Sequence, residues 1–499
     1  MSAARSEQVV VIGAGMAGLF TALALGGAGR SILLLERDPP PPAGDADAVF
    51  DGWRRRGATQ LRHSHAFLAR LRTLITAEHP ELLAALQASG VRELGFADGL
   101  PDTLKPPYAP APGDDELAVL VSRRSTLEAV IRAHVEKLSG VELRSGVFVE
   151  AIDLARDPDG RARVTGVRLQ DGETIGAELI VDAAGRGSPV AGWLAAEGLE
   201  PPQTSEPCGI LYYTRFYRLL PGQSEPPRGD RSANGDLTFL KFGVFPADGG
   251  TFSVTVAAPE IEERLRAAIV RPDLFEAICA QLPGLAPWTD PARSEPVSVV
   301  HAMGALESRW REMAPGGRAL VRGLFCVGDS LVRTNPLYGR GCSFAAVEAH
   351  LLRDCLAASA DPDARATAYE KAVRGELHPF YRDMVRQDRD AVRRARRLLA
   401  QDRAPTTLRG RVLRDFIENG VTPALRLDAD LLRAAMRAFH MLDPPGVWLK
   451  RPRNLIKVLG VWMRGRRANA HLRALSPGPS RDQMLPTLGL SLEPSLSEP

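Results

Sequence analysis

The opening of the chain shows apolar runs and small residues in the order of a strand, a helix and a second strand. Residues 8–12 are a β-branched run, residues 16–29 are mostly small and apolar, and residues 31–35 form another apolar run. Three such elements within about 30 residues predict a βαβ unit whose strands lie buried in a parallel sheet. The prolines at 39–42 end this unit.

The α/β pattern continues beyond this unit. Leucine and isoleucine at helical spacing predict helical structure within 61–90, and a further helix is predicted at 126–138. Strand-like segments follow at 141–149, 162–169 and 178–183. These elements extend the same α/β layer.

The pattern changes between residues 205 and 260. Aromatic and β-branched runs at 208–219 and 237–256, separated by Gly, Asp and Pro turns, predict an antiparallel sheet. A buried strand at 319–327 and a helix at 341–358 then return to the first pattern.

Composition places the chain among ordinary folded proteins. It has 499 residues, of which 44% are apolar and 25% charged. A single core stops growing near about 250–300 residues, so two or three lobes are expected. These values exclude a disordered, a collagen-like and a disulfide-built chain, and the net charge of +3 does not indicate a nucleic-acid partner.

Two features bear on the compartment. An uncharged stretch at 8–29 is long enough to span a bilayer, but its many glycines favour the buried βαβ unit. The cysteines are widely spaced without a C-x-x-C pair, which predicts reduced thiols in a cytoplasmic protein and no zinc site. They are Cys208, Cys279, Cys326, Cys342 and Cys355.

Basic residues concentrate toward the end of the chain. Residues 381–473 hold 22 Lys+Arg against nine Asp+Glu, a net of +13, and residues 446–467 have seven basic and no acidic residues. Two interpretations of 446–467 stay open. It is either an amphipathic segment in peripheral contact with an anionic membrane, or a helix that packs its apolar side on the α/β domain and leaves its charges in solvent.

A glycine motif joins the first predicted strand to its helix. Its first glycine permits a tight turn, its second lets a pyrophosphate approach the backbone, and its third lets helix and strand pack closely. Glu36, followed by Arg37, ends the second strand, where an acid can accept both hydroxyls of a ribose. The motif predicts a nucleotide site and consists of Gly13, Ala14, Gly15, Met16, Ala17 and Gly18.

A second motif lies at 326–345. A predicted strand delivers a Gly-Asp pair ending at Asp329, a loop with Asn335 follows, and Gly339 and Gly341 open a helix. Asp329 can accept hydrogen bonds from hydroxyl groups. The N–H groups at the start of the helix can stabilise negative charge.

These motifs, with V-D-A-A-G at 181–185, resemble FAD-dependent monooxygenases of the para-hydroxybenzoate-hydroxylase-like fold. N-P-L-Y-G-R-G and V-D-A-A-G-R-G-S resemble most the olefin epoxidases of the polyether and squalene types. The resemblance covers roughly residues 8–375. It implies an α/β fold: a Rossmann-like FAD-binding domain of the glutathione-reductase type, an inserted antiparallel β-sheet substrate domain and a helical C-terminal region.

The resemblance and the pattern changes together divide the chain into domains. The FAD-binding domain is expected in two parts, with the substrate domain between them. The predicted ranges are 1–200 (with an irregular crossover near 95–120) and 301–375 for the FAD-binding domain, 201–300 for the substrate sheet, 376–475 for a basic helical region and 476–499 for a loose tail.

The resemblance also assigns roles to residues. The glycine motif and Glu36 with Arg37 would hold the ADP half of FAD, and Asp329 the ribityl chain. Arg124 matches the family arginine near the FAD phosphates and ribityl chain. The loop facing the flavin ring would comprise Pro336, Leu337, Gly339, Arg340, Gly341 and Cys342.

The implied reaction is monooxygenation. Reduced FAD would react with O₂ to give a C4a-hydroperoxide, whose distal oxygen passes to a small lipophilic, electron-rich substrate by epoxidation or hydroxylation, as in secondary metabolism. The alternative is an FAD-dependent reductase or dehydrogenase of prenyl-like substrates, since such enzymes share N-P-x-x-G-x-G. A third interpretation is a membrane-surface binding protein that keeps FAD only structurally.

The chain departs from the family at its third motif. Aromatic hydroxylases of this fold carry an Asp-Gly pair linked to FAD and NADPH, whereas Ala184 precedes Gly185 here. Electrons from NAD(P)H are therefore expected either directly or through a separate flavin reductase. The W-x-W-x-I-P motif of flavin halogenases is absent, which argues against halogenation, and Lys241 is expected to snorkel from a strand.

Two groups of side chains carry weaker signals. His63 and His65 are interpreted as polar lining of a cleft in preference to a metal site, and neither is assigned as a catalytic base. Strand alternation predicts that half of the sheet aromatics face helices as core, while the other half could line an apolar pocket. These aromatics are Tyr212, Tyr213, Phe216, Phe239, Phe242, Phe245 and Phe252.

Overall fold

The computed structural model describes residues 7–229, 232–400, 407–472 and 477–491. The chain divides into two compact units, each built from three stretches of sequence. Unit 1 comprises Met1–Val91, Ser122–Cys208 and Glu307–Val385, and unit 2 comprises Arg92–Val121, Gly209–Leu306 and Arg386–Pro499.

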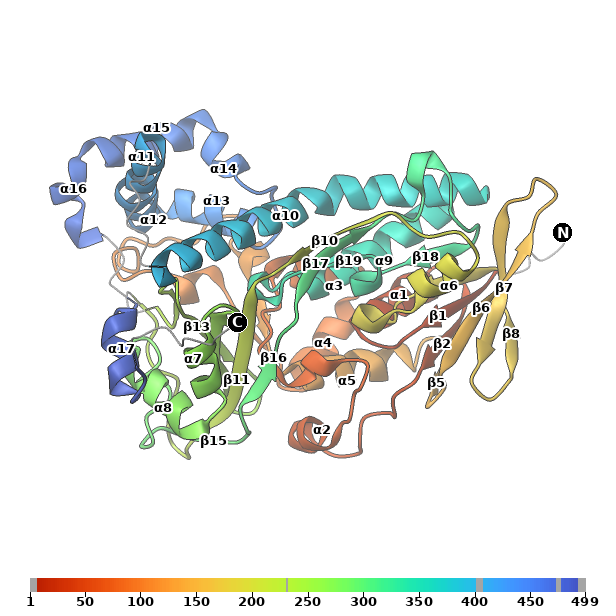
Figure 1. Cartoon of the computed structure of the whole chain (residues 1–499), viewed down its shortest axis with the longest axis horizontal. Helices are drawn as coiled ribbons and strands as arrows, with labels where there is room; N and C mark the ends of the chain where they lie inside the picture. The colour runs from red at the N-terminus through yellow and green to blue at the C-terminus, as the bar shows by residue number, and fades with distance from the viewer. Residues whose placement is uncertain (1–6, 230–231, 401–406, 473–476, 492–499) are drawn as a thin grey trace. The chain divides into compact units, whose positions relative to one another are not determined.

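Unit 1 is built on a parallel sheet with the strand order β18-β9-β1-β2-β5 (Figure 1). Beyond their first residues β1 and β2 are buried along their length, which explains their uninterrupted apolar runs. The register aligns Ile12 with both Leu35 and Asp182, so three strands end at the same edge. The strands are β1 (Gln8–Ile12), β2 (Ser31–Glu36), β5 (Val141–Ser145), β9 (Leu179–Asp182) and β18 (Leu324–Cys326).

Helices α1 and α9 of unit 1 pack against each other. Both begin at a glycine-containing turn, and α9 confirms the helix predicted at 341–358. The helices are α1 (Met16–Gly26), α2 (Ala46–Gly52), α3 (Ala69–Glu78), α4 (Pro80–Ala88), α5 (Arg124–Val135), α6 (Val190–Ala196), α9 (Gly341–Ala358) and α10 (Pro362–Leu399), which continues into unit 2.

Two smaller sheets complete unit 1. The antiparallel sheet β6-β7-β8 consists of β6 (Val149–Arg156), β7 (Ala162–Leu169) and β8 (Thr174–Gly176). The sheet β10-β17-β19 consists of β10 (Gln203–Pro207), β17 (Glu307–Arg311) and β19 (Val332–Arg333). In the second of these sheets, β10 precedes the unit 2 segment Gly209–Leu306 in the sequence, and β17 and β19 come after it.

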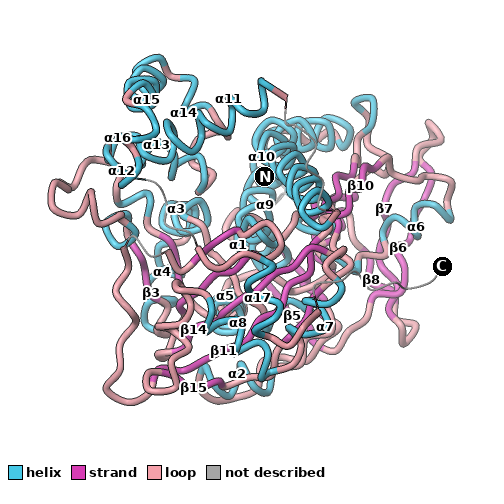
Figure 2. Tube along the Cα trace, turned by 60° about the vertical axis from the view of Figure 1, so that its left-hand side comes forward, coloured by secondary structure: helices cyan, strands magenta, loops and turns pink. Residues whose placement is uncertain are grey.

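Unit 2 contains an antiparallel sheet with the order β12-β13-β14-β11-β15 and with β16 beside β11 (Figure 2, strands in magenta). Apolar side chains of this sheet form one core with those of α7, α8 and α17. The elements are β11 (Ile210–Leu219), β12 (Asn234–Asp236), β13 (Lys241–Pro246), β14 (Thr251–Pro259), β15 (Ser294–Pro296), β16 (His301–Met303), α7 (Glu263–Ile269), α8 (Pro272–Gln281) and α17 (Arg481–Thr487).

Unit 2 also holds a short strand pair and the C-terminal helices. The pair is β3 (Arg92–Leu94) with β4 (Val119–Val121). The helices are α11 (Leu408–Phe416), α12 (Thr422–Leu427), α13 (Ala429–Phe439), α14 (Val447–Lys450), α15 (Pro452–Met463) and α16 (Gly465–Ala468), with a π-helical turn at Ile417–Val421.

This architecture confirms the predicted fold class, a parallel α/β sheet joined to an antiparallel sheet and C-terminal helices. The details differ at three places. The crossover near 95–120 groups with unit 2, and the predicted boundary at 376 falls inside α10. The prediction of a loose tail does not hold for residues 481–488, because Met484 and Leu485 of α17 are buried in the core of the unit 2 sheet. The last part of that predicted tail, 492–499, lies outside the described residues.

Candidate cofactor site

The turn after β1 can be made only by glycine at two positions. Gly13 has φ +98°, and a Cβ there would lie 2.7 Å from the carbonyl oxygen of Ala183. A Cβ on Gly18 would lie 1.8 Å from the carbonyl oxygen of Gly13. The turn therefore packs tightly against both α1 and the end of β9.

Gly15 faces open space instead. It is the N-cap of α1, and no side chain caps the helix there. The nearest atom to a Cβ on Gly15 would be Nη2 of Arg55, at 4.0 Å. The N–H groups of a first helical turn lack intrahelical partners and carry the positive end of the helix dipole. This space is consequently suited to a phosphate or pyrophosphate.

Glu36 lies at the end of β2 and is held firmly. Its Oε2 accepts hydrogen bonds from the N–H of Ala14 at 2.7 Å and from Nη2 of Arg55 at 3.0 Å, and its Oε1 accepts from the N–H of Asp38 at 2.9 Å. A carboxylate has about four acceptor positions. Oε1 thus keeps capacity for a ribose hydroxyl, the role predicted for Glu36.

Arg55 is a site residue that sequence reasoning missed. Its guanidinium joins three buried carboxylates: Nη2 lies 3.0 Å from Glu36, Nη1 lies 2.8 Å from Glu128, and Nε lies 3.5 Å from Asp38. It also stacks over the ring of Trp53 at 4.9 Å. The one available signal was the Trp-Arg-Arg-Arg run at 53–56, and that run does not say which arginine is buried.

The V-D-A-A-G motif at 181–185 packs against the other side of the glycine turn after β1. Asp182 ends β9 and is fully buried; its Oδ1 accepts from the N–H of Ala184 at 3.0 Å, and its Oδ2 accepts from the hydroxyl of Ser188. Burial raises the pKa of Asp182, while these two hydrogen bonds lower it. The side chain is therefore committed to shaping its own turn.

The second predicted motif lies directly beside the first. Gly328 has φ +72°, and a Cβ there would lie 2.7 Å from the Cβ of Ala17 in α1. Ser330 donates its hydroxyl proton to the carbonyl oxygen of Asp182 at 2.6 Å. The structure thus brings Asp329 close to the glycine motif although more than 300 residues separate them in sequence.

Asp329 is half-buried among arginines. Burial raises the pKa of its carboxyl, and the positive charges of Arg333, Arg124 and Arg309 oppose that rise. Arg309 also donates to the backbone carbonyl of Asp329 at 2.8 Å. The surrounding charge favours a carboxylate that can accept hydrogen bonds from hydroxyl groups.

The loop before α9 is held by its own backbone constraints. Asn335 accepts through Oδ1 from the N–H of Leu337 at 3.0 Å. Gly339 has φ +64°, and a Cβ there would lie 2.9 Å from the Cβ of Ala66. Helix α9 then starts at Gly341 without a side-chain cap, so its first N–H groups are available to a ligand.

The side chain of Arg124 reaches the start of α9. Its Nη1 lies 3.2 Å from Sγ of Cys342 and 3.5 Å from Nε2 of His65, and its guanidinium pairs with Glu128 at 2.7 Å. Burial and the charge of Arg124 lower the pKa of His65 to about 3, so this imidazole is neutral at physiological pH. Burial raises the pKa of Cys342, which keeps it a thiol.

The side chains of several residues predicted for the cofactor site are turned to other parts of the chain or to solvent. The side chain of Arg340 points to α10, where Nη1 donates to the carbonyl oxygen of Phe380 at 3.1 Å, so we expect only its backbone to serve a cofactor. Arg37 is half-buried, and Pro336 and Leu337 are exposed.

No metal centre is seen in the part of the chain that the structure describes, where no group of three or more His, Cys, Asp or Glu side chains is placed to hold an ion. His65 instead contacts Arg124, and its Nδ1 lies 2.9 Å from the carbonyl oxygen of His63.

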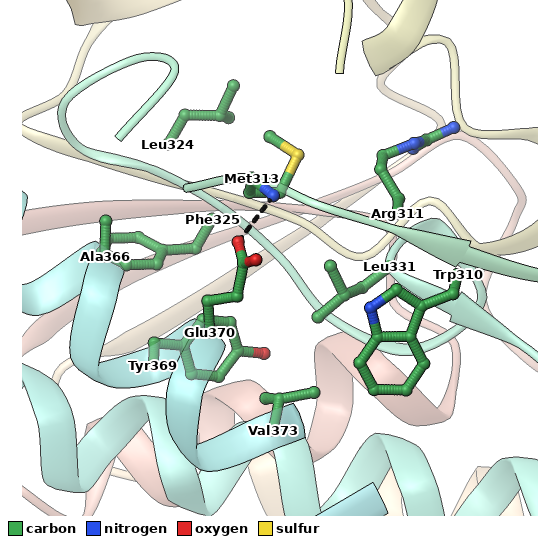
Figure 3. A pocket seen from close by; sticks show the side chains of 10 residues that line it. All are labelled: Trp310, Arg311, Met313, Leu324, Phe325, Leu331, Ala366, Tyr369, Glu370 and Val373. Atoms are coloured by element: carbon green, nitrogen blue, oxygen red, sulfur yellow. Dashed lines mark hydrogen bonds between the residues drawn. The ribbon is translucent and has the colours of Figure 1, made fainter. Parts of the chain in front are cut away.

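A cavity between β17, β18 and α10 does not serve the cofactor site (Figure 3). Its volume of about 10 Å³ holds no more than a single water molecule. Glu370 at its wall accepts from the N–H groups of Met313 at 3.0 Å and Ala314 at 2.6 Å. This carboxylate therefore has a structural role.

The residues present fit FAD at both ends of the site. The open face of Gly15, the start of α1 and Oε1 of Glu36 suit the ADP half. Asp329 and the start of α9 suit the ribityl chain and the flavin ring.

Replacing Asp329 by alanine is expected to weaken FAD binding about ten- to a hundredfold, because hydrogen bonds to a charged acceptor contribute about 1.5–3 kcal/mol each. Titrating the apoprotein with FAD, followed by flavin fluorescence, measures this loss. Asp171→Ala, in the exposed turn between β7 and β8, is the matched control and should leave FAD affinity unchanged. Full FAD retention in Asp329→Ala would contradict the assignment.

Comparison with known proteins supports this cofactor. Residues 8–102 match the family described as FAD dependent oxidoreductase. Protein Rv3254 of Mycobacterium tuberculosis (strain ATCC 25618 / H37Rv) is 29% identical over 383 residues, which cover 70% of this chain and 73% of that protein.

Solved structures share the fold at low identity. The p-nitrophenol 4-monooxygenase PnpA from Pseudomonas putida DLL-E4 matches with a TM-score of 0.57 and 17% identity, over 88% of this chain and 98% of that chain. The flavin-dependent brominase Bmp2 matches with a TM-score of 0.55 and 18% identity, over 82% of this chain and 93% of that chain. The family match and the geometry of the glycine turn agree on FAD as the cofactor, and the protein is an FAD-dependent oxidoreductase.

Proposed function

We propose that the protein is a monooxygenase that transfers one oxygen atom of O₂ to a small lipophilic, electron-rich substrate, by epoxidation or hydroxylation. The observation that carries this proposal is the start of α9. There the uncapped helix N-terminus at Gly341 lies beside the buried guanidinium of Arg124, which contacts Cys342. This end of the site is built to stabilise negative charge.

Bound FAD, once reduced, supplies the electrons that activate O₂. The residues of the chain position the cofactor and exclude water. Arg124 and the N–H groups of α9 hold negative charge at the ring end of the site, and Glu128 keeps Arg124 in place. His65 is neutral beside Arg124 and adds no competing positive charge. Oxygen transfer to an alkene needs no protein base, and none is assigned.

The choice between oxygenation and halogenation rests on the residues of this chain. PnpA is a monooxygenase and Bmp2 a brominase, so the shared fold alone does not choose between the two reactions. The chain lacks the W-x-W-x-I-P motif, and Lys241, expected to snorkel from a strand, forms an ion pair with Asp236. These observations support a monooxygenase.

The sheet of unit 2 supports an apolar substrate. Tyr213, Tyr217 and Phe252 belong to the core shared with α7 and α8, as do Phe239 and Phe242. Because side chains alternate along a strand, Tyr212 and Phe216 lie on the opposite face of β11. Thr214 shares that face, and its hydroxyl lies 2.7 Å from that of Thr255. We propose this second face as the substrate surface.

The third motif supports a separate flavin reductase as the electron source. Ala184 replaces the acid of the aromatic hydroxylases, and the nearby Asp182 is buried and engaged by Ala184 and Ser188. Anaerobic NADPH is therefore expected to reduce the bound flavin slowly by itself and rapidly after addition of a flavin reductase. Rapid bleaching by NADPH alone would show that NADPH binds directly.

The reaction is tested by mixing the photoreduced holoprotein with buffer containing ¹⁸O₂ and a panel of lipophilic alkenes and phenols. A monooxygenase is expected to reoxidise through a transient absorbance that matches neither reduced nor oxidised FAD, and to give a product with one ¹⁸O atom. Stoichiometric hydrogen peroxide without labelled product for the whole panel would contradict the proposal. A saturated product would instead identify the reductase.

A further inference from the structure

Helix α15 of unit 2 is apolar on two opposite faces. Val458 and Val461 are buried against neighbouring helices. Ile456, Leu459 and Met463 have the spacing i, i+3, i+7 and share the other face. Ile456 is 69% exposed and Met463 is 78% exposed. Large apolar side chains grouped in this way on a surface mark an interaction site.

Helix α11 also carries exposed apolar side chains. Leu408 and Leu413 are exposed, and no residue of α11 is buried. The two helices are neighbours (Figure 1). The ring of Phe416 at the end of α11 meets the ring of Trp462 in α15 edge-on, with centroids 5.4 Å apart. We call these apolar side chains and the exposed basic residues of the two helices the α11/α15 surface. It comprises the exposed Leu408, Leu413, Ile456 and Met463, the half-buried Leu459, and Arg409, Arg411, Arg453 and Arg464.

The charge around these side chains is strongly positive. Residues 407–472 contain 13 Lys+Arg and five Asp+Glu, a net of +8. Among these acids, Asp415 accepts from Nε1 of Trp462 at 2.8 Å and from Nε of Arg466 at 2.7 Å, and Asp428 pairs with Lys457, whereas Glu418 is exposed. The electrostatic potential around the α11/α15 surface is therefore positive and comes from arginine and lysine.

We propose that the α11/α15 surface docks the protein on an anionic lipid bilayer, with α15 lying in the plane of the headgroups. Exposed bulky apolar side chains flanked by basic residues have the chemistry of an interfacial helix, which combines apolar insertion with attraction to acidic lipids. No helix in the described part of the chain has the length and apolarity needed to cross a bilayer, which is compatible with surface attachment.

A second copy of the chain fits this surface less well. A two-fold contact would place the same patch against itself, so the arginines of one copy would face the basic patch of the other. Like charges brought together in this way oppose the contact, whereas anionic headgroups neutralise them. Charge complementarity thus selects the bilayer. The proposal does not depend on the reaction that the protein catalyses.

Flotation of the full-length holoprotein with vesicles tests the proposal. We expect binding to vesicles of phosphatidylcholine mixed with phosphatidylglycerol, weak binding to phosphatidylcholine alone, and loss of binding at high salt. The double variants Ile456→Ser with Met463→Ser, and Arg453→Glu with Arg464→Glu, are each expected to lower the partition coefficient about tenfold or more. Val299→Ser, which removes another 68% exposed apolar side chain of unit 2, is the matched control and should bind normally.

Retained FAD and an unchanged Tm show that a variant is folded, so a loss of binding reports on the surface itself. Absence of binding to acidic vesicles overturns the proposal. Equal binding to neutral and acidic vesicles overturns the role of the arginines. A concentration-dependent dimer that Ile456→Ser abolishes would assign the surface to a second copy of the chain and also overturn the proposal.

Discussion

Gly15→Ala is expected to abolish FAD binding while the apoprotein stays folded. Gly15 has φ −80° and ψ −170°, a conformation that alanine adopts without strain. Its Cβ would meet no atom closer than Nη2 of Arg55, at 4.0 Å, so the folded protein has room for it. The methyl group would occupy the space in front of the helix N-terminus, where the pyrophosphate must approach the backbone.

Gly18→Ala is the matched variant with the opposite outcome. Its Cβ would lie 1.8 Å from the carbonyl oxygen of Gly13 and 2.9 Å from the carbonyl carbon, and a backbone group cannot rotate away as a side chain can. Helix α1 would have to move away from the turn after β1. Overpacking of this kind costs about 3 kcal/mol or more, so the apoprotein itself is destabilised.

Thermal unfolding of the two apoproteins and their FAD content after purification separate these effects. The expected result is a normal Tm without FAD for Gly15→Ala, and a lowered Tm for Gly18→Ala. Normal FAD content in Gly15→Ala would show that the pyrophosphate lies elsewhere. Equal loss of Tm in both variants would show that the motif acts only in packing.

The fold of unit 1 could be predicted because its signals are local. The strands at 8–12 and 31–35, and the helix at 341–358, each carry their own apolar pattern and a glycine turn. The α17 segment could not be predicted in this way. Its two buried residues, Met484 and Leu485, form too short a pattern to stand out, and they pack on a sheet more than 200 residues earlier in the chain.

Arg55 shows the same limit in the cofactor site. Arg54 and Arg56, the neighbours of Arg55 in the Arg-Arg-Arg run, are exposed, while Arg55 is buried among acids. Its burial depends on Glu36 and Glu128, which come from β2 and from α5. Sequence reasoning assigned Glu36 to the ribose from its place after a strand. The position of Glu36 at the end of a strand does not reveal that Arg55 neutralises its charge.

Arg55→Met is expected to destabilise the apoprotein by about 3–5 kcal/mol, since removing one partner of a buried ion pair leaves its charges uncompensated. Methionine keeps much of the side-chain volume, so the loss reports mainly on charge. The carboxylates of Glu36 and Glu128 would then lie in the same buried region without a shared cation. FAD binding is expected to fall as well, because Glu36 is held for the ribose by this arginine.

Urea unfolding of the apoproteins measures the free energy, and two further variants identify its source. Arg56→Met removes an arginine whose side chain is 82% exposed and is expected to change the free energy of unfolding by less than about 0.5 kcal/mol. Glu36→Gln in the Arg55→Met background removes a buried carboxylate that has lost its ion-pair partner, Arg55, and is expected to restore part of the stability. If Arg55→Met unfolds at the same urea concentration as the unmodified protein, Arg55 does not neutralise the buried acids. If Glu36→Gln restores nothing, the loss comes from packing on Trp53 and not from charge.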